Sequence, residues 1–349
     1  MPVSSYIHRL RQKVGHDLLH IPSVTIVVFD EQGRVLLVKD AGSGQWTTPG
    51  GAIDPGERPA DAAMREMWEE TNLLVELSHI TGIYGGPEFF ITYPNGDQTS
   101  YFMTVFAARI AGGKMRPDQV EILEADYFAP DDLDRLDLSS WKRLVLADAF
   151  QSQPQTRYQP NTWRPVPGGV RTGGMSDYIR QIRAKVGNEQ LMSPAVWAIV
   201  VNEEGYILLQ KRADNGRWAP PAGGVEPHES PTQAVVREVW EETGVLVEPI
   251  CLADIYSGPE YNFTFAGSGD GVEIFSVLYL CRPIGGHPEP DGLESVDVAY
   301  FAPEALEFLP EKWQRRTADA FQNHAIARFY PATWQPHHGL GHKPPPRPG

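Results

Sequence analysis

The sequence carries one acidic cassette twice. Residues 51–73 read GAIDPGERPADAAMREMWEETNL, and residues 223–245 read GGVEPHESPTQAVVREVWEETGV. Each copy has a Gly, five residues, a Glu, seven residues, and then Arg-Glu-apolar-Trp-Glu-Glu-Thr. Equivalent residues, such as Glu57 and Glu229, lie 172 positions apart. A spacing this constrained, written twice, requires the same local structure to form in each half of the chain.

The repetition extends well beyond the cassettes. IYGGPEF (83–89) is answered by IYSGPEY (255–261), and RYQPNTW (157–163) by RFYPATW (328–334). A chain of 349 residues exceeds the usual size of one domain, so we expect two domains of one kind. The predicted division is a first domain at 1–165, a Gly-rich linker at 166–175, a second domain at 176–337 and a disordered Pro/Gly-rich tail at 338–349.

Charge and cysteine content exclude several classes of function. The formal net charge of −15 argues against a nucleic acid polymer as partner, because proteins that bind polyanions usually present basic surfaces. Cys251 and Cys281 are the only cysteines, which favours free thiols in a reducing compartment over a disulfide framework. No segment approaches 18 consecutive apolar residues, and the N-terminus lacks a signal-like apolar core. We therefore expect a cytoplasmic protein without membrane contact.

Hydrophobic patterning predicts helices and strands without a regular βαβ alternation. In the first half we expect an amphipathic helix at 5–14, a hairpin of strands at 23–30 and 34–39, and a strand at 100–110. A helix through the second part of the cassette and another at 141–150 complete the unit, which the second half repeats. Pro59 and Pro231 suit a first helical turn, and Ser230 with Gln233 resembles a capping box. The pattern favours an α+β fold over a doubly wound sheet.

The cassette concentrates carboxylates on one helical face. Glu66, Glu69 and Glu70 stand at i, i+3 and i+4, as do Glu238, Glu241 and Glu242 in the second copy. Carboxylates with Cβ atoms about 6 Å apart repel by roughly 2–3 kcal/mol per pair at an effective dielectric constant near 20, unless a cation neutralises them. Ligands that are all oxygen suit Mg²⁺, with Mn²⁺ as the alternative, and disfavour zinc. Such cations neutralise a pyrophosphate and activate water for attack on phosphorus.

Both cassettes resemble the Nudix box, Gly-x5-Glu-x7-Arg-Glu-U-x-Glu-Glu-x-Gly-U with U a bulky aliphatic residue. The resemblance implies the Nudix fold in both halves, each a mixed β-sheet sandwiched between α-helices. It also implies Mg²⁺-dependent hydrolysis of a nucleoside diphosphate linked to a further group X. By the same resemblance, Arg65 and Arg237 orient the carboxylates, and Glu66, Glu69, Glu238 and Glu241 are catalytic. The implied metal ligands are the backbone carbonyls of Gly50 and Ala222 and the side chains of Glu57, Glu66, Glu69, Glu70, Glu229, Glu238, Glu241 and Glu242.

Departures from the box fall on its glycines and never on its acids. Asn72 replaces the late glycine of the first box, where Asn is the next best residue for a left-handed helix C-cap. In the second box, Ala222 stands in the upstream turn and His228 replaces Gly56. His tolerates positive φ better than most residues, so we expect both boxes to be intact.

Several residues outside the acidic face are candidates for substrate or metal contact. Glu121 and Glu294 precede the YFAP strands, and we consider them as additional metal ligands or as the base, or else as solvated loop acids. Trp46 and Trp218 are candidates for stacking on a base, with core packing as the alternative. Glu88 and Glu260 are candidate substrate contacts, or ordinary exposed acids. Trp68 and Trp240 lie on another helix face and are expected in the core.

The favoured function is a tandem Nudix hydrolase that splits the pyrophosphate bond of a small nucleotide of the ADP-ribose or nucleotide-sugar type. One alternative is a nucleoside triphosphate pyrophosphohydrolase that removes oxidised nucleotides such as 8-oxo-dGTP. The other, from a different class, is a non-catalytic nucleotide-sensing module. The duplication further suggests an intramolecular pseudo-dimer of the two domains.

Overall fold

The computed structural model describes residues 4–151, 155–166, 171, 176–264, 269–322 and 326–336. The first half contains α1 (Ser5–Val14), β1 (Leu19–Val28), β2 (Val35–Asp40), β3 (Trp46–Thr47), β4 (Gly50–Ala52), α2 (Pro59–Thr71), β5 (Leu73–Tyr84), β6 (Phe90–Thr92), β7 (Gln98–Gly113), β8 (Ile122–Phe128), α3 (Ser140–Ala149) and β9 (Arg157–Tyr158). The second half contains α4 (Asp177–Val186), β10 (Leu191–Val200), β11 (Ile207–Arg212), β12 (Trp218–Ala219), β13 (Ala222–Gly224), α5 (Pro231–Thr243), β14 (Val245–Tyr256), β15 (Asn262–Thr264), β16 (Gly271–Gly286), β17 (Ser295–Phe301) and α6 (Glu311–Phe321). Short 3-10 turns at Pro87–Phe89, Pro130–Arg135, Pro259–Tyr261 and Pro303–Phe308 complete the two units.

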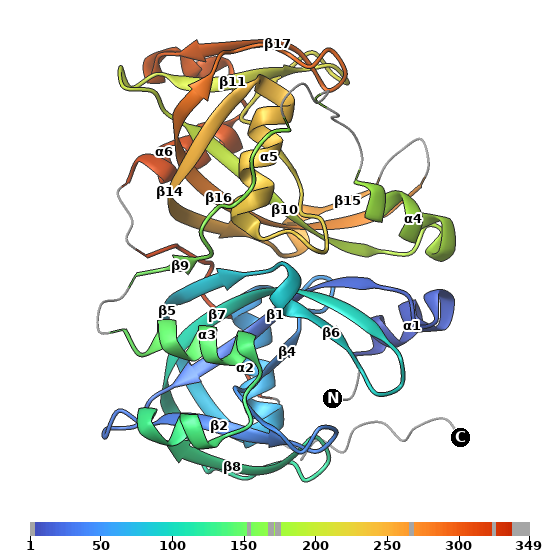
Figure 1. The fold of residues 1–349 in the computed structure, drawn as a ribbon, viewed down its shortest axis with the longest axis vertical. Coiled ribbons are helices and arrows are strands. Elements are labelled where there is room, and N and C mark those ends of the chain that lie inside the picture. Colours follow the sequence, from blue (N-terminus) through green and yellow to red (C-terminus); the bar gives the residue numbers. More distant parts are fainter. Residues whose placement is uncertain are drawn as a thin grey trace.

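Each half is built around a mixed sheet. In the first half its order is β4-β1-β7-β5-β9, with β1 and β7 parallel and β7 and β5 antiparallel. The second half repeats this as β13-β10-β16-β14. Smaller sheets, β3-β2-β8 and β12-β11-β17, lie beside them. Helices α2 and α5 pack on the mixed sheets, while α3 and α6 cover other parts of each half, so the α+β prediction is confirmed (Figure 1).

Of the hairpin predicted from strands 23–30 and 34–39, the structure forms the turn but not a ladder between β1 and β2. The two segments join through the antiparallel bridge between Phe29 and Val35 and the hydrogen bond from the Asp30 amide to the Arg34 carbonyl, and Val201 and Ile207 form the matching bridge in the second half. Strand β1 instead lies between β4 and β7, while β2 pairs with β3 and β8. All ten residues of β1 are buried, so this strand has a neighbour on each side and belongs in the interior of its sheet.

The cassette helices begin and end where their sequences predict. Pro59 and Pro231 each occupy the first helical turn, and Ser230 forms a capping box with Gln233. Asn72 adopts the left-handed conformation with φ of 57°, as Gly244 does in the second copy. His228 differs from this expectation: among the described residues, Asn72 and Gln119 are the non-glycine residues with positive φ. The turn before α5 therefore takes another backbone path than the one that Gly56 allows before α2.

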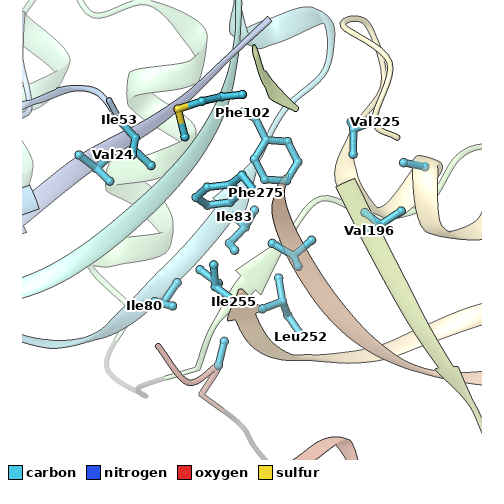
Figure 2. Packing of buried hydrophobic residues seen from close by; sticks show 14 of the residues in the cluster. Val24, Ile53, Ile80, Ile83, Phe102, Val196, Val225, Leu252, Ile255 and Phe275 are labelled. Carbon is cyan, nitrogen blue, oxygen red and sulfur yellow. The ribbon is translucent and has the colours of Figure 1, made fainter. Parts of the chain in front are cut away.

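The two halves share one hydrophobic cluster. The Phe102 and Phe275 rings, which are equivalent positions of the repeat, meet edge to face at 5.5 Å between centroids (Figure 2). The Tyr178 hydroxyl accepts a hydrogen bond from the His20 amide at 2.8 Å, and the Tyr6 hydroxyl accepts one from the Met192 amide at 3.0 Å. Because these bonds are exchanged between equivalent residues, the contact has the form of a two-fold axis.

Reciprocal ion pairs border this contact, where α1 and α4 lie side by side at one edge of the molecule (Figure 1). Lys13 pairs with Glu189 at 2.7 Å, and the equivalent residues Lys185 and Asp17 form the matching pair. Both pairs are partly exposed, so each contributes at most about 1 kcal/mol. The buried aromatic and aliphatic contacts therefore supply most of the stabilisation between the halves.

We predict that His20 makes the contact between the halves sensitive to acid. The side chain is buried beside the rings of Phe102 and Tyr178, and this burial, with a smaller effect of His228, lowers the pKa of His20 to about 3. The unfolded chain binds a proton near pH 6.5 and the folded chain does not, so stability falls as the pH drops from 6.5 towards 3. From pH 7 to pH 5 the loss from this group is about 2 kcal/mol.

The measurement is urea unfolding of the natural chain and of His20→Met at both pH values. Methionine is the residue at the equivalent position of the second half, Met192, so the site accepts its shape. The variant is expected to lose less stability than the natural chain on acidification. An equal loss in both proteins would show that His20 does not carry the effect.

Candidate active site

A single arginine gathers the acids of each cassette. Arg65 donates from Nε to Glu57 at 2.8 Å and from Nη1 to Glu66 at 2.8 Å and Glu69 at 3.1 Å. Its Nη2 also donates to the backbone carbonyl of Ala52 at 3.1 Å. The turn before α2, the helix itself and strand β4 are therefore held by one guanidinium group, whose five donors suit such a fork.

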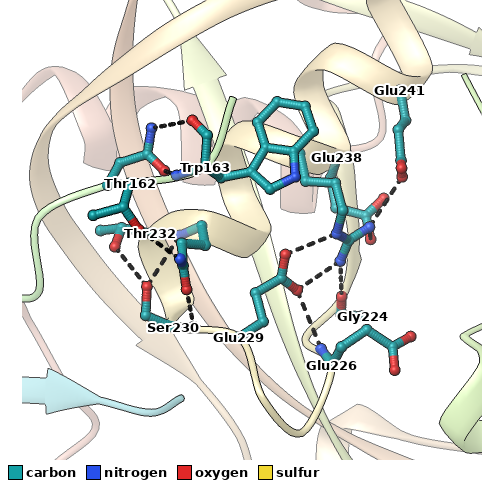
Figure 3. A network of polar contacts seen from close by, with 12 residues as sticks. Thr162, Trp163, Gly224, Glu226, Glu229, Ser230, Thr232, Glu238 and Glu241 are labelled. Atoms are coloured by element: carbon teal, nitrogen blue, oxygen red, sulfur yellow. Dashed lines mark hydrogen bonds and ion pairs between the residues drawn. The ribbon is translucent and has the colours of Figure 1, made fainter. Parts of the chain in front are cut away.

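The second cassette repeats this arrangement (Figure 3). Arg237 donates to Glu229 at 2.8 Å, to Glu238 at 2.8 Å and to Glu241 at 3.0 Å. The carbonyl of Gly224 accepts a further bond at 2.9 Å. Two independent copies of the cassette thus converge on one geometry, in which the arginine orients the acids as the family resemblance implies.

Burial makes the central acids hard to ionise. Burial, with the neighbouring charges of Glu69 and Glu57, raises the pKa of Glu66 to about 7 even though Arg65 opposes the shift. The pKa of Glu238 is raised to about 7 in the same way. A cation placed among these carboxylates would favour their charged forms and relieve the repulsion.

A fourth carboxylate of each box lies against the strand that precedes the helix. Burial raises the pKa of Glu70 well above its usual value, and its Oε2 accepts a hydrogen bond from the Gly50 amide at 3.1 Å. Glu242 is equally buried and accepts from the Ala222 amide at 2.9 Å. The backbone at Gly50 and Ala222 therefore lies beside the box acids, where the sequence predicts carbonyl ligands.

Gly51 on β4 and Gly223 on β13 allow each strand to lie close to its cassette helix. A Cβ atom at Gly51 would overlap the carboxylate of Glu66, and one at Gly223 would overlap that of Glu238. Only glycine permits this approach of backbone and acid. The requirement explains why both copies of the cassette begin with Gly.

The predicted additional acids lie at the same site. Glu121 is buried, and burial raises its pKa to about 8, with further contributions from Glu66 and Glu69. Glu294, its counterpart, acts electrostatically on Glu241 and Glu242. The alternative that both are solvated loop acids does not describe Glu121, which is 8 % exposed.

The acids fit a divalent cation by chemistry, although they are turned towards the arginines. In the described parts of the chain, no three His, Cys, Asp or Glu side chains converge as a ready-made ion site. Glu57, Glu66 and Glu69 point to Arg65, which is the nearest positive charge. The donor set consists of carboxylates and backbone carbonyls, the ligands preferred by Mg²⁺ and Mn²⁺. Its residues fit such an ion if side chains rotate from arginine to metal.

The two sites differ in enclosure. The side chain of Glu69 is 44 % exposed and that of Glu241 is 16 % exposed. Buried Gln210 bonds to Glu242 in the second half, whereas Val38 occupies the equivalent place in the first. The second cassette therefore holds its acids in a drier and more polar-lined setting than the first.

The remaining candidates have other surroundings. Trp46 and Trp218 are half-buried against Phe128 and Phe301, which favours packing over base stacking. Glu88 is exposed. Glu260 forms an ion pair at 3.4 Å with Arg58 of the opposite half. The predicted substrate contacts of Glu88 and Glu260 stay predictions.

Trp68 and Trp240 are half-buried and do not belong to the main clusters of the described residues. Their expected place in the core is therefore only partly correct. They directly precede Glu69 on α2 and Glu241 on α5.

Sequence reasoning gave no role to the segments RYQPNTW and RFYPATW. In the structure, Thr333 and Trp334 line an open hollow of about 380 Å³ together with Glu57 and Arg65 of the first cassette. In the second half, Trp163 lies beside the cassette helix, near Glu238 (Figure 3). The signal was present in the repetition of both segments, but sequence alone does not show that each crosses to the other half.

The sequence model of the NUDIX domain matches residues 19–149 and 192–323. This chain belongs to the Nudix family. The predicted pair of Nudix domains is confirmed, and with it the enzyme class, a hydrolase that acts on pyrophosphate bonds. Hydrolases of this family use divalent metal ions. Among the described residues, no helix has the length and apolar character needed to cross a membrane.

Individual relatives align with one half of the chain. A MutT-like protein of Streptomyces ambofaciens is 38% identical over 131 residues, which is 37% of this chain and 77% of that protein. A putative 8-oxo-dGTP diphosphatase of Bacillus subtilis (strain 168) is 32% identical over 135 residues, 39% of this chain and 83% of that protein. An ADP-ribose pyrophosphatase structure from Streptococcus suis superposes with a TM-score of 0.31 at 23% identity, covering 40% of this chain and 98% of that one.

Proposed function

We propose that this Nudix hydrolase splits a diphosphate bridge at two sites, one in each half, with Mg²⁺ as the ion and Mn²⁺ as its substitute. The observation that carries the proposal is the duplicated cluster in which one arginine holds three box glutamates at 2.8–3.1 Å. A module that only sensed nucleotides would need no second complete copy of this cluster.

The chain's own residues would divide the work as follows. Glu57, Glu66, Glu69 and Glu70, with the Gly50 carbonyl, would hold the cation in the first site, and Glu229, Glu238, Glu241, Glu242 and the Ala222 carbonyl in the second. The bound ion neutralises diphosphate charge and lowers the pKa of a water molecule. Arg65 and Arg237 orient the carboxylates. Glu121 and Glu294 each supply a further carboxylate that is placed to hold a cation or accept a proton.

For the substrate, we favour a nucleoside triphosphate of the 8-oxo-dGTP type, which was the alternative at the level of sequence. The relative named for this activity is 32% identical and aligned over 83% of its length. ADP-ribose is the second candidate, and the contact between the halves supports it.

The turn at Pro87–Phe89 follows Gly86, which lies against Ser230 of the opposite cassette. Loop residues of both halves therefore meet beside one site, which suits a substrate with two large parts.

The substrate order is tested by hydrolysis of 8-oxo-dGTP and ADP-ribose with Mg²⁺ under identical conditions. We expect at least a tenfold higher kcat/KM for 8-oxo-dGTP, which corresponds to about 1.4 kcal/mol of transition-state binding. Products separate the routes, since the first yields a monophosphate and pyrophosphate and the second AMP and ribose phosphate. A preference for ADP-ribose would restore the order favoured from sequence.

We also propose that the halves remain paired in solution as an intramolecular pseudo-dimer in a cytoplasmic protein. The support is the reciprocal set of bonds of Tyr6 and Tyr178 and the shared cluster around Phe102 and Phe275. Small-angle scattering of the full chain is expected to give the radius of one compact particle. A scattering curve of two separated bodies would contradict the pairing.

A further inference from the structure

The segment after the last helix of each half crosses to the other half. We call residues 155–163 the first arm and residues 326–334 the second arm. The first arm pairs with its own half through β9 and β5 and then places the Tyr158 ring 5.7 Å from that of Tyr279. The second arm places the Phe329 ring 5.0 Å from that of Phe106. The two contacts are reciprocal, so neither is an accident of one loop.

Each arm forms hydrogen bonds with the same position of the opposite cassette helix, a contact that we call the grip. Asp61, in the first turn of α2, accepts hydrogen bonds from the backbone amides of Thr333 at 2.5 Å and Trp334 at 2.6 Å. Gln233, the equivalent residue of α5, donates to the Thr162 hydroxyl at 2.7 Å. One grip uses a carboxylate that accepts and the other an amide that donates. The arm therefore binds the helix at the equivalent position in both halves, although the hydrogen-bonding groups differ.

Each grip sets a tryptophan beside the arginine cluster. Trp334 and Thr333 form one wall of the hollow whose other walls include Glu57 and Arg65. At the second site, the Trp163 side chain extends from the contact at α5 towards Glu238, while Glu229 lies on the turn before this helix (Figure 3). Both indoles are half-buried, so each covers part of the cluster and leaves part open.

We propose that Trp334 and Trp163 are positioning residues supplied across the interface, Trp334 for the first catalytic site and Trp163 for the second. Each indole shields the pair of arginine and first box glutamate from water. Shielding lowers the local dielectric constant and strengthens the bonds that orient the acids. The inference rests on the proposed function for its activity readout, and on metal affinity for a readout that needs no turnover.

The test uses full-length chains in which one site is silenced. In a Glu241→Gln chain, only the first site is intact, and adding Trp334→Ala is expected to lower kcat about tenfold with little change in KM. Mn²⁺ affinity of that site, followed by the paramagnetic signal of free Mn²⁺, is expected to weaken by about the same factor. Trp163→Ala in this chain leaves both values at those of the parent. In a Glu69→Gln chain the effects of the two tryptophans exchange.

Two further variants separate positioning from a general effect on folding. Trp334→Phe retains an aromatic cover and is expected to recover most of kcat. Arg164→Ala, at an exposed residue that directly follows the first arm, is the control. If Trp334→Ala lowers the unfolding temperature, Asp61→Asn weakens the grip without emptying the hollow and is expected to show a smaller effect at the first site.

The inference requires that each tryptophan affects the catalytic site of the opposite half and not that of its own half. The inference is overturned if each tryptophan affects the site of its own half, if both sites respond equally, if neither responds, or if KM alone changes. If the parent chains hydrolyse no nucleotide, the proposed function fails. The Mn²⁺ affinities then judge the inference by the same crossed pattern.

Discussion

Replacing Glu69 and Glu241 together by glutamine is expected to lower Mg²⁺-stimulated hydrolysis by about a hundredfold or more. Metal-ion catalysis contributes several kcal/mol of transition-state stabilisation, and each 1.4 kcal/mol is about a tenfold change in rate. Glutamine keeps the shape of the side chain but loses the charge that a cation needs. Both residues are the most exposed of the three that bind their arginine, so the fold should tolerate the change.

The matched control is Glu76→Gln with Glu248→Gln. These residues are also equivalent positions of the repeat, but they lie on β5 and β14 in exposed ion pairs with Arg109 and Arg282. Steady-state rates with Mg²⁺ and circular dichroism of both double variants are the measurements. Undiminished hydrolysis in the Glu69 and Glu241 variant would remove the cassettes from the mechanism. A natural chain that binds nucleotide but never hydrolyses it would support the sensing alternative.

Local rules were sufficient to predict the cassette from sequence. Pro at the first turn and Asn or Gly at the end delimit α2 and α5, because these residues have few other conformations available. The spacing of Glu66, Glu69 and Glu70 then places their side chains on one face, whatever the rest of the fold does. For this reason the shared face of these acids was predicted from their spacing, whereas the role of Arg65 was implied by the resemblance to the Nudix box.

Features that depend on long-range contacts were not predictable in the same way. Strand β1 was assigned to a hairpin because its neighbour in sequence is also a strand, but its partners in the sheet are the distant strands β4 and β7, and helix α2 packs on it. His228 was expected to copy the backbone of Gly56, but its ring lies 5.3 Å from that of Phe90 in the other half. The arms were visible as a repeat, yet no local pattern says which half they cover.

The domain boundaries also depend on long-range contacts. Of the predicted linker 166–175, Val166 and Arg171 are described, and the predicted tail 338–349 lies outside the described residues. The division at 165 separates an arm from its linker and not a self-contained unit from its neighbour. Because Trp163 lies on the second cassette, a cut at this point removes a piece of one half from the site of the other.

Replacing Arg237 by methionine is expected to lower the free energy of unfolding by about 3–5 kcal/mol, the cost of removing one partner from a buried ion cluster. The Arg237 side chain is 17 % exposed, and its partners Glu229 and Glu238 are 11 % and 10 % exposed. Methionine fills similar space but leaves these carboxylates without their cation. Urea unfolding in EDTA measures the loss, and Arg109→Met, in an exposed pair, is the control with an expected loss of at most about 1 kcal/mol.

The same variant locates the metal without any need for turnover. If Mg²⁺ or Mn²⁺ binds among Glu229, Glu238 and their neighbours, the ion replaces part of the positive charge that Arg237 supplied. Adding the ion should therefore stabilise Arg237→Met by a larger amount than it stabilises the natural chain. Equal stabilisation of both proteins would place the ion elsewhere. A loss no greater than that of Arg109→Met would mean that the arginine does not hold the acids, and the electrostatic basis of the site would be wrong.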